Sequence, residues 1–169
     1  MTDEGSPVPY RAFTVDEANA LLPDLEEVFR HLEGLRERMR ADTDRLQVLD
    51  LLWGVELKSP SNPDRGEFLE RRSSVRETMA LVEDVVRKEF LDRGIRFPPG
   101  GLEHGLLDFP TTYQGRWVFL CWRRGEESVQ AWHELDGGFQ GRRPLTEEQA
   151  LVMGRETGEE GSGPSHPWE

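Results

Sequence analysis

The residues best suited to chemistry gather in one segment, Cys121 to Leu145. It holds the chain's only cysteine, the adjacent pair His133 and Glu134, and a loop rich in glycine and arginine over residues 136–143. Histidine is the usual metal ligand, and its side chain is the one most easily set to act as an acid or a base near neutral pH. The segment is therefore the first place to look for a site, although the same mixture also suits a packed β-hairpin followed by a turn.

His133 offers a candidate metal site. Neighbouring side chains of a strand point to opposite faces, so His133 and Glu134 are not expected to hold the same ion. Asp136 and Asp108 are expected on the His133 side, and a cluster of Asp108, His133 and Asp136 would bind a hard divalent cation. The alternative is a strand-end histidine that only hydrogen-bonds to a carbonyl or a carboxylate. No spacing of the HExxH type favours the metal.

Cys121 is predicted to be a buried, unreactive thiol. It lies between Leu120 and Trp122, whereas a nucleophilic cysteine needs an electropositive and partly exposed setting. With a tight turn at Gly125-Glu126, Cys121 also faces away from His133. A Cys–His pair is therefore not expected.

The loop over residues 136–143 is a candidate anion site. Its glycines would let the backbone approach a ligand closely, and Arg142 and Arg143 would clamp a phosphate or a carboxylate. Its glycine spacing matches no phosphate-binding motif. The alternative is a turn whose arginines pair with acidic side chains. The candidate binding residues are His133, Glu134, Asp136, Asp108, Arg142 and Arg143.

The overall charge limits what such a site would bind. The 169 residues include 33 Asp and Glu against 21 Lys and Arg, a formal net charge of −12. Nucleic acid needs a basic face, so it is not expected as a partner. A single cysteine excludes an intrachain disulfide, and no apolar run is long enough to span a membrane. The N-terminus lacks the features of a signal peptide, and a cytoplasmic protein is the expectation.

Two segments with heptad spacing are expected to position these residues. Apolar residues recur every seven positions in the first segment, at Leu25, Leu32, Met39, Leu46 and Trp53. The second segment repeats the spacing at Phe68, Val75 and Val82, with Met79 and Val86 at the other apolar position. Separated by a turn over residues 59–66, the segments predict an antiparallel helical hairpin with coiled-coil packing over residues 14–93.

Five residues in or next to this region carry local signals. Thr14 and Glu17 predict a capping box at the start of the first helix. Pro23 removes a helical hydrogen bond, so it predicts a kink or a second helix that begins at the proline. Asp42 interrupts the first heptad series. Gly94 suits a C-terminal cap after the second segment.

Over residues 104–136 the apolar period becomes two, which is typical of β-strands. Strands are predicted over 106–113, 116–123 and 128–135. The turn at Gly125-Glu126 would pair Cys121 with Gln130, and Phe119 with Trp132. Both faces are apolar at mid-strand, so the sheet is expected to be covered by the helices and by another subunit. A capping box at 146–149 then predicts a short helix within residues 137–154.

Several short stretches are similar to a known family. "FTVDEANALLP", "GLLDFP", "LCWRRGE" and "AWHELDGGFQGRRPL" resemble the bacterial family called domain of unknown function 2203, over about residues 12–146. The likeness is close at residues 108–110, 121–122, 125–126, 132–134 and 138–144; Leu107 stands where valine is more usual. The resemblance implies a bacterial, cytoplasmic protein and implies no activity.

Together these patterns predict an α+β fold, a long antiparallel helical hairpin packed with a small antiparallel β-sheet and a short C-terminal helix. A single domain is expected over residues 13–154, between disordered ends at 1–12 and 155–169. A homodimer is expected. The favoured role is a non-enzymatic interaction or regulatory module, because no complete catalytic constellation is visible, and another protein is a further candidate partner. The alternative is a metal-dependent or anion-binding enzyme around His133 and the 136–143 loop, with a divalent metal as its cofactor.

Overall fold

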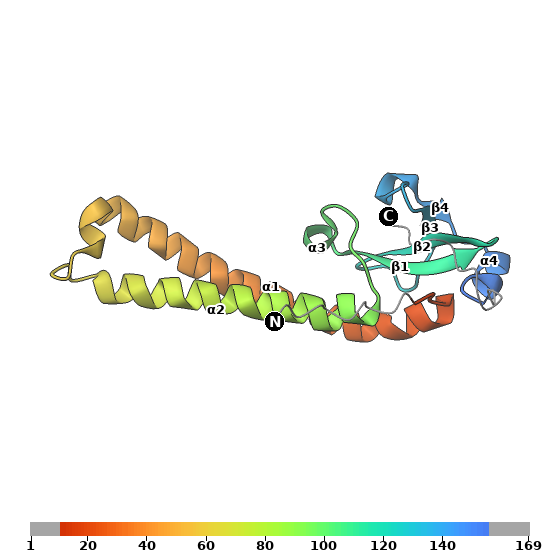
Figure 1. Ribbon diagram of the computed structural model, residues 1–169, viewed down its shortest axis with the longest axis horizontal. Coiled ribbons are helices and arrows are strands. Elements are labelled where there is room, and N and C mark those ends of the chain that lie inside the picture. Colours follow the sequence, from red (N-terminus) through yellow and green to blue (C-terminus); the bar gives the residue numbers. More distant parts are fainter. Residues whose placement is uncertain (1–10, 156–169) are drawn as a thin grey trace, which may run out of the picture. The chain divides into compact units, whose positions relative to one another are not determined.

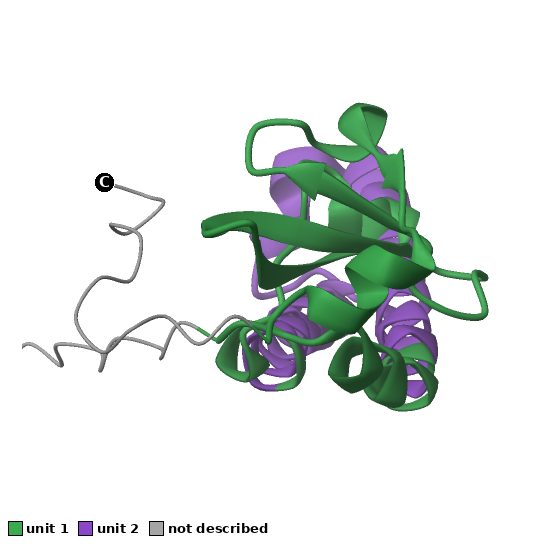
Figure 2. Cartoon of the chain, turned by 90° about the vertical axis from the view of Figure 1, so that its right-hand side faces the viewer, with its two compact units in different colours: residues 1–26, 89–169 green, residues 27–88 purple. Residues whose placement is uncertain are grey.

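The computed structural model describes residues 11–155 and confirms an α+β fold. The chain forms two compact units, one of residues up to 26 together with those from 89 onwards, the other of residues 27–88. Figure 1 shows the order of the elements, and Figure 2 shows the two units in different colours. The predicted disordered ends, 1–12 and 155–169, lie outside the described residues except at their inner limits.

Helix α1 (Val15–Trp53) begins at the predicted capping box. The backbone N–H of Glu17 donates to Thr14 Oγ1 at 3.1 Å, and the N–H of Thr14 donates to Glu17 Oε2 at 3.0 Å. Of the two outcomes predicted for Pro23, a second helix that begins at the proline is wrong, because the proline lies inside α1, and the kink stays a prediction. The flanking Leu22 and Leu25 are both buried, and their packing offsets the roughly 3 kcal/mol that an internal proline costs.

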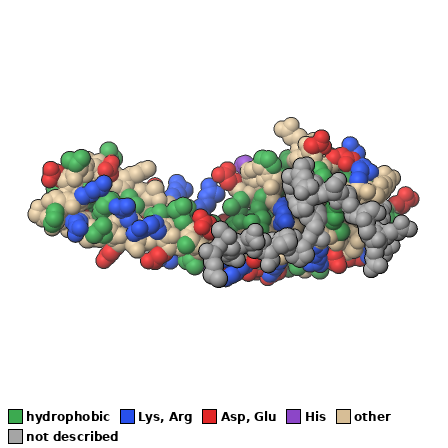
Figure 3. Space-filling view, in the orientation of Figure 1, with side chains coloured by type: hydrophobic (Ala, Val, Ile, Leu, Met, Phe, Trp, Pro, Cys, Tyr) green, Lys and Arg blue, Asp and Glu red, His purple; other side chains and the backbone are tan. Residues whose placement is uncertain are grey.

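The second unit contains the predicted helical hairpin. The rest of α1 is followed by a 3₁₀ segment, η1 (Gly54–Lys58), a turn, and α2 (Arg65–Glu89). Heptad positions on α1 are buried at Leu32, Leu35 and Leu49. On α2 the buried residue is Thr78, whereas the predicted seam residue Met79 is 49% exposed. Figure 3 shows charged and hydrophobic side chains interspersed along the hairpin. Among the described residues, no helix is both long and apolar enough to cross a membrane.

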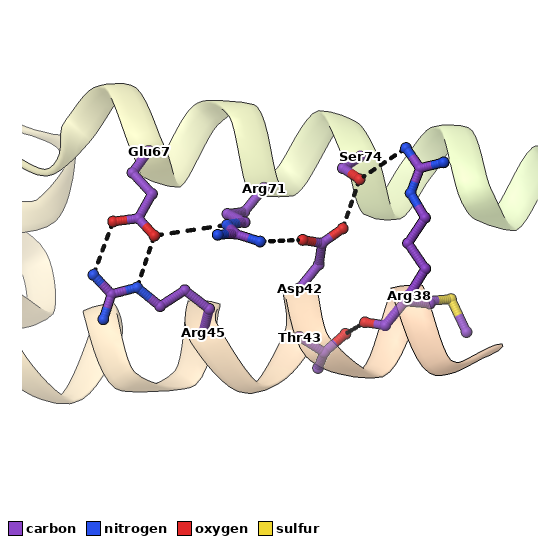
Figure 4. Close-up of polar contacts among 8 residues, drawn as sticks. Arg38, Asp42, Thr43, Arg45, Glu67, Arg71 and Ser74 are labelled. Carbon is purple, nitrogen blue, oxygen red and sulfur yellow. Dashed lines mark hydrogen bonds and ion pairs between the residues drawn. The ribbon is translucent and has the colours of Figure 1, made fainter. Parts of the chain in front are cut away.

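A polar network joins α1 to α2 where Asp42 interrupts the heptads (Figure 4). The buried Asp42 carboxylate accepts hydrogen bonds from Ser74 Oγ at 2.6 Å and from Arg71 Nη1 at 2.7 Å. Arg45 donates two bonds to Glu67 at 2.7 and 2.8 Å. A polar residue at a core heptad position fixes the alignment of two helices, because shifting the helices would leave it without partners.

The first unit contains an antiparallel sheet in the order β1-β2-β3-β4. Strands β1 (Leu106–Tyr113) and β2 (Arg116–Arg123) have the predicted bounds, and β3 (Ala131–Glu134) is shorter than predicted. A fourth strand, β4 (Arg143–Pro144), lies in the segment predicted as a loop. Between β1 and β2, Gln114 and Gly115 both have positive φ, as a two-residue hairpin turn requires.

The predicted pairing of β2 with β3 is wrong by one residue. Phe119 pairs with His133 and Cys121 pairs with Ala131, because the connection runs from residue 124 to 130 rather than turning tightly at Gly125-Glu126. Trp122 Nε1 donates to the carbonyl of Glu126 at 3.0 Å and holds this connection against the sheet. A shift of one residue moves every side chain of a strand to the other face. Cys121 therefore shares a face with His133.

The start of α1 covers one face of the sheet. The rings of Phe13 and Phe109 meet edge to face at 5.3 Å, and Thr111 Oγ1 donates to the carbonyl of Phe13 at 2.6 Å. The mid-strand residues on both faces, Leu120 and Cys121 among them, are buried within a single chain. The sheet itself therefore does not require a second subunit, and the homodimer stays a prediction.

Short elements complete the first unit. A 3₁₀ turn, η2 (Leu91–Arg93), ends at Gly94 with φ of 87°, as expected for a glycine cap. Helix α3 (Gly101–His104) precedes β1, and η3 (Phe139–Gly141) precedes β4. The predicted capping box of Thr146 and Gln149 is confirmed at the start of α4 (Glu147–Val152).

Candidate functional site

Three buried side chains with metal-ligand chemistry converge in the middle of the sheet. Asp108 comes from β1, Cys121 from β2 and His133 from β3, and they are 3%, 0% and 1% exposed. Each offers one ligand atom, and these atoms all lie within 4.8 Å of one another. The strand register explains the convergence. Asp108 pairs with Cys121 across β1 and β2, Cys121 pairs with Ala131 across β2 and β3, and His133 lies two residues after Ala131 on the same face. We call these three residues the sheet cluster.

His133 has a hydrogen-bond partner at each ring nitrogen. Nδ1 lies 2.7 Å from the carbonyl oxygen of Glu134, to which it donates, and Nε2 lies 3.0 Å from Asp108 Oδ1. Burial disfavours the charged imidazolium. The hydrogen bond to Asp108, the negative charge of Asp108 and the hydrogen bond to the Glu134 carbonyl favour it and outweigh the effect of burial. The pKa of His133 is therefore raised above its ordinary value. The ring is held in one orientation, with Nε2 toward Asp108.

The Cys121 thiol is not poised for nucleophilic attack. Burial, followed by the negative charge of Asp108, raises the pKa of Cys121 to about 12. A thiol of this kind keeps its proton near neutral pH, and only the thiolate is a good nucleophile. The expectation of an unreactive cysteine is thus supported, whereas the expectation that it faces away from His133 is wrong.

The remaining carboxylates of the predicted site lie elsewhere. Asp136 is exposed and follows β3. The third member of the cluster with Asp108 and His133 is Cys121 and not Asp136. Glu134 accepts two hydrogen bonds from Arg116, at 2.6 and 3.1 Å. These bonds hold the pKa of the Glu134 carboxyl below its usual range. Glu134 thus serves an ion pair at the end of β3.

The two arginines of the predicted anion loop have protein partners. Arg142 Nη2 donates to both carboxylate oxygens of Glu126, at 2.8 and 2.9 Å, and also to the carbonyl of Cys121 at 3.4 Å. Arg143 lies over the Trp132 ring at 5.1 Å, with Glu134 at 3.7 Å. The arginines therefore close the loop onto the sheet. A carboxylate of the same chain therefore pairs with Nη2 of Arg142, while Nε of the same guanidinium is buried without a hydrogen-bond partner among the described residues.

A second candidate surface lies at the end of the helical hairpin. Leu51, Leu52 and Val55 are 85%, 64% and 89% exposed, and Val48 is also exposed. Val48, Leu51 and Leu52 follow the spacing i, i+3 and i+4 on α1, and Val55 lies in η1 directly after Gly54, where a positive φ of 51° ends the regular α-helix. We call them the hairpin stripe. The heptad pattern does not indicate this surface, because none of its four residues stands at a heptad position such as Leu46 or Trp53.

One comparison with known proteins gives a match. The family model described as "Uncharacterized conserved protein (DUF2203)" matches residues 11–145, which is most of the chain. Neither the curated proteins nor the solved structures include a significant match. The resemblance stated from the sequence motifs is confirmed, and the matched residues include the sheet cluster and the hairpin stripe.

Proposed function

This chain belongs to the family of uncharacterized conserved proteins DUF2203, and we propose that it is a non-enzymatic interaction module that pairs with a second copy of itself. The hairpin stripe is the proposed contact surface. The family description gives no activity, so the proposal rests on the surface and on the chemistry of the candidate residues.

The observation that carries the proposal is the exposure of the hairpin stripe. Leu51 and Val55 are each more than four-fifths exposed although both are large and apolar. Single exposed apolar residues are common, but four within eight residues at the end of one helix are typical of an interaction surface. Burial of such a stripe against a partner would remove apolar surface from water at about 25 cal/mol per Å².

Charges around the stripe favour a second copy as the partner. Exposed acidic residues of α1 and η1 lie beside the stripe, at Asp44, Asp50 and Glu56. The outer side of α2 presents Leu69 among exposed arginines on the same helical face, at Arg65, Arg72 and Arg76. In a twofold dimer each surface meets its counterpart twice, so the acidic border of one hairpin would face the basic row of the other.

The enzyme alternative finds less support. An acid or base must reach its substrate, whereas His133 is buried and both its ring nitrogens are engaged. Cys121 keeps its proton, and Arg142 is paired with Glu126. His133 and Arg142 thus bind other groups of the same chain.

The proposal predicts a concentration-dependent dimer. Sedimentation velocity over micromolar to hundred-micromolar concentrations should show monomers converting to dimers. Leu51→Glu should weaken the dimer about 10- to 100-fold, since burying a leucine contributes roughly 1.5–3 kcal/mol and each 1.4 kcal/mol is a factor of ten. Added salt should weaken it further, because the charged borders are exposed.

Leu81→Glu is the matched control. Leu81 is an exposed leucine on α2 of the same hairpin, outside the stripe and outside the Leu69 face, so this variant should dimerise like the parent chain. A parent chain that stays monomeric across the series would overturn the proposal. Equal loss of dimer in both variants would show that the stripe is not the contact surface.

A further inference from the structure

We propose that the sheet cluster of Asp108, Cys121 and His133 is a binding site for a thiophilic divalent cation, with Zn²⁺ as the best match. This inference is independent of the proposed self-association, because the cluster lies in the first unit and the stripe in the second. The predicted cluster of Asp108, His133 and Asp136 would have favoured a hard cation. The observed cluster contains the sulfur of Cys121 in the place of the Asp136 carboxylate, and this difference in ligands changes the expected metal.

The donor set selects the ion. A carboxylate oxygen, a thiol sulfur and an imidazole nitrogen suit zinc, which accepts all three, whereas Mg²⁺ and Ca²⁺ require mainly oxygen ligands. Zinc bonds of about 2.0–2.3 Å place tetrahedral ligand atoms roughly 3.4–3.8 Å apart. The three ligand atoms lie within 4.8 Å of one another, so a shift of about 1 Å would bring them into range. Three protein ligands leave the fourth tetrahedral position to a water molecule.

The orientation of His133 fits metal ligation through Nε2. Histidine ligands of metals almost always donate their other ring N–H to a carbonyl or a carboxylate, which fixes the tautomer and aims the lone pair at the ion. Here Nδ1 lies 2.7 Å from the Glu134 carbonyl oxygen, and Nε2 faces Asp108. Gly137 packs closely over His133, where an added Cβ would lie 3.4 Å from the histidine Cβ. Gly137 thus lies against the Cβ of His133, while the ring itself is held through Nδ1, which leaves Nε2 to the cluster.

Charge balance also favours a divalent ion. A Zn²⁺ ion bound by the Asp108 carboxylate, the Cys121 thiolate and neutral His133 forms a site with no net charge. Neutrality matters because an unbalanced charge in a buried position is costly. The nearby Arg142 adds little, since Glu126 neutralises its guanidinium. On binding, the thiol proton leaves to solvent, as metal–thiolate bonding requires.

Cobalt(II) titration of the full chain tests the site directly. Co²⁺ replaces zinc in such sites and gives a thiolate-to-metal charge-transfer absorption. Cys121 is the only cysteine of the chain, so this band reports on the sheet cluster alone. The expected result is a band that saturates at one Co²⁺ per chain and disappears when Zn²⁺ is added. Zn²⁺ should also raise the thermal unfolding midpoint, because a ligand of the native state stabilises it by mass action.

Two substitutions separate ligation from folding. Cys121→Ser should abolish the band, and Asp108→Asn should weaken Co²⁺ binding by at least about 100-fold, the upper range for loss of a supporting group. Circular dichroism without metal establishes that each variant is folded. His31→Ala, which removes an exposed histidine of α1, should bind as the parent chain does. Absence of binding by the folded parent chain would overturn the proposal, and so would binding that survives in folded Cys121→Ser.

Discussion

Trp122→Ala is expected to lower the free energy of unfolding of the sheet-containing unit by about 3–5 kcal/mol, the range for truncating a fully buried tryptophan. Trp122 is 1% exposed, and its indole N–H donates to the Glu126 carbonyl at 3.0 Å. Its loss would leave a cavity beneath the sheet and release the connection that sets the pairing of β2 with β3. Urea unfolding followed by circular dichroism measures the change.

Trp53→Ala is the matched control for this prediction. Trp53 is 37% exposed and lies at the end of α1, where its indole N–H donates to Asp64 Oδ2 at 2.8 Å. Its removal should cost under about 2 kcal/mol, because less apolar surface is lost and the remaining carboxylate can be hydrated. Equal costs for the two variants would mean that Trp122 does not anchor the sheet.

The elements with strong local patterns were predictable. Strands β1 and β2 have the predicted bounds because alternating apolar residues and the Gln114-Gly115 turn both specify them. Both capping boxes were found from side-chain types at fixed spacing, and their hydrogen bonds form as expected. Signals of this kind depend on contacts within a few residues, which a sequence displays directly.

The pairing of β2 with β3 was not predictable in the same way. A turn at Gly125-Glu126 is locally reasonable, but Glu126 instead receives hydrogen bonds from Trp122 and Arg142, and Val129 donates to Asn19 Oδ1 at 2.7 Å. These contacts reach across the unit, up to 110 positions along the chain. They favour a longer connection and shift the register by one residue.

The register error had its main consequence at the candidate site. Asp108 and His133 were expected to share a cluster, and His133 Nε2 lies 3.0 Å from Asp108 Oδ1. Cys121 was left out of that cluster because it was predicted to be a buried, unreactive thiol, and because the shifted pairing turned it to the other face. Asp136 was included as a nearby carboxylate, although it follows His133 by three residues and lies beyond the end of β3 at Glu134, where the period of two no longer applies.

The helical hairpin shows a similar limit. Heptad spacing identifies an apolar side of each helix, but the middle of the seam is polar. Asp42, Arg71 and Ser74 meet there, and Thr78 is buried in place of Met79. The sequence marked Asp42 as an interruption. Only the pairing of the two helices shows that the interruption has partners on the facing helix.

Asp42→Ala is therefore expected to destabilise the hairpin by about 2–4 kcal/mol. The substitution removes an acceptor that binds Ser74 and Arg71 and leaves a cavity in the seam. The cost stays below that of a fully buried pair, because Arg71 is 41% exposed and can be hydrated. Loss of helical circular dichroism in urea measures it. Asp44→Ala removes an exposed carboxylate of the same helix and should change stability by less than about 0.5 kcal/mol.

The same contact should make the hairpin sensitive to acid. Hydrogen bonds from Ser74 and then Arg71 outweigh burial and hold the pKa of the Asp42 carboxyl below its ordinary value. A carboxyl whose pKa is lower in the folded chain contributes its full stability above the unfolded pKa, and loses it as pH falls through the folded one. Asp42→Asn cannot titrate, so the difference in unfolding free energy between the parent chain and this variant should shrink below about pH 4. A difference that stays constant from neutral pH into that acid range would show that the charge of Asp42 does not hold α1 to α2.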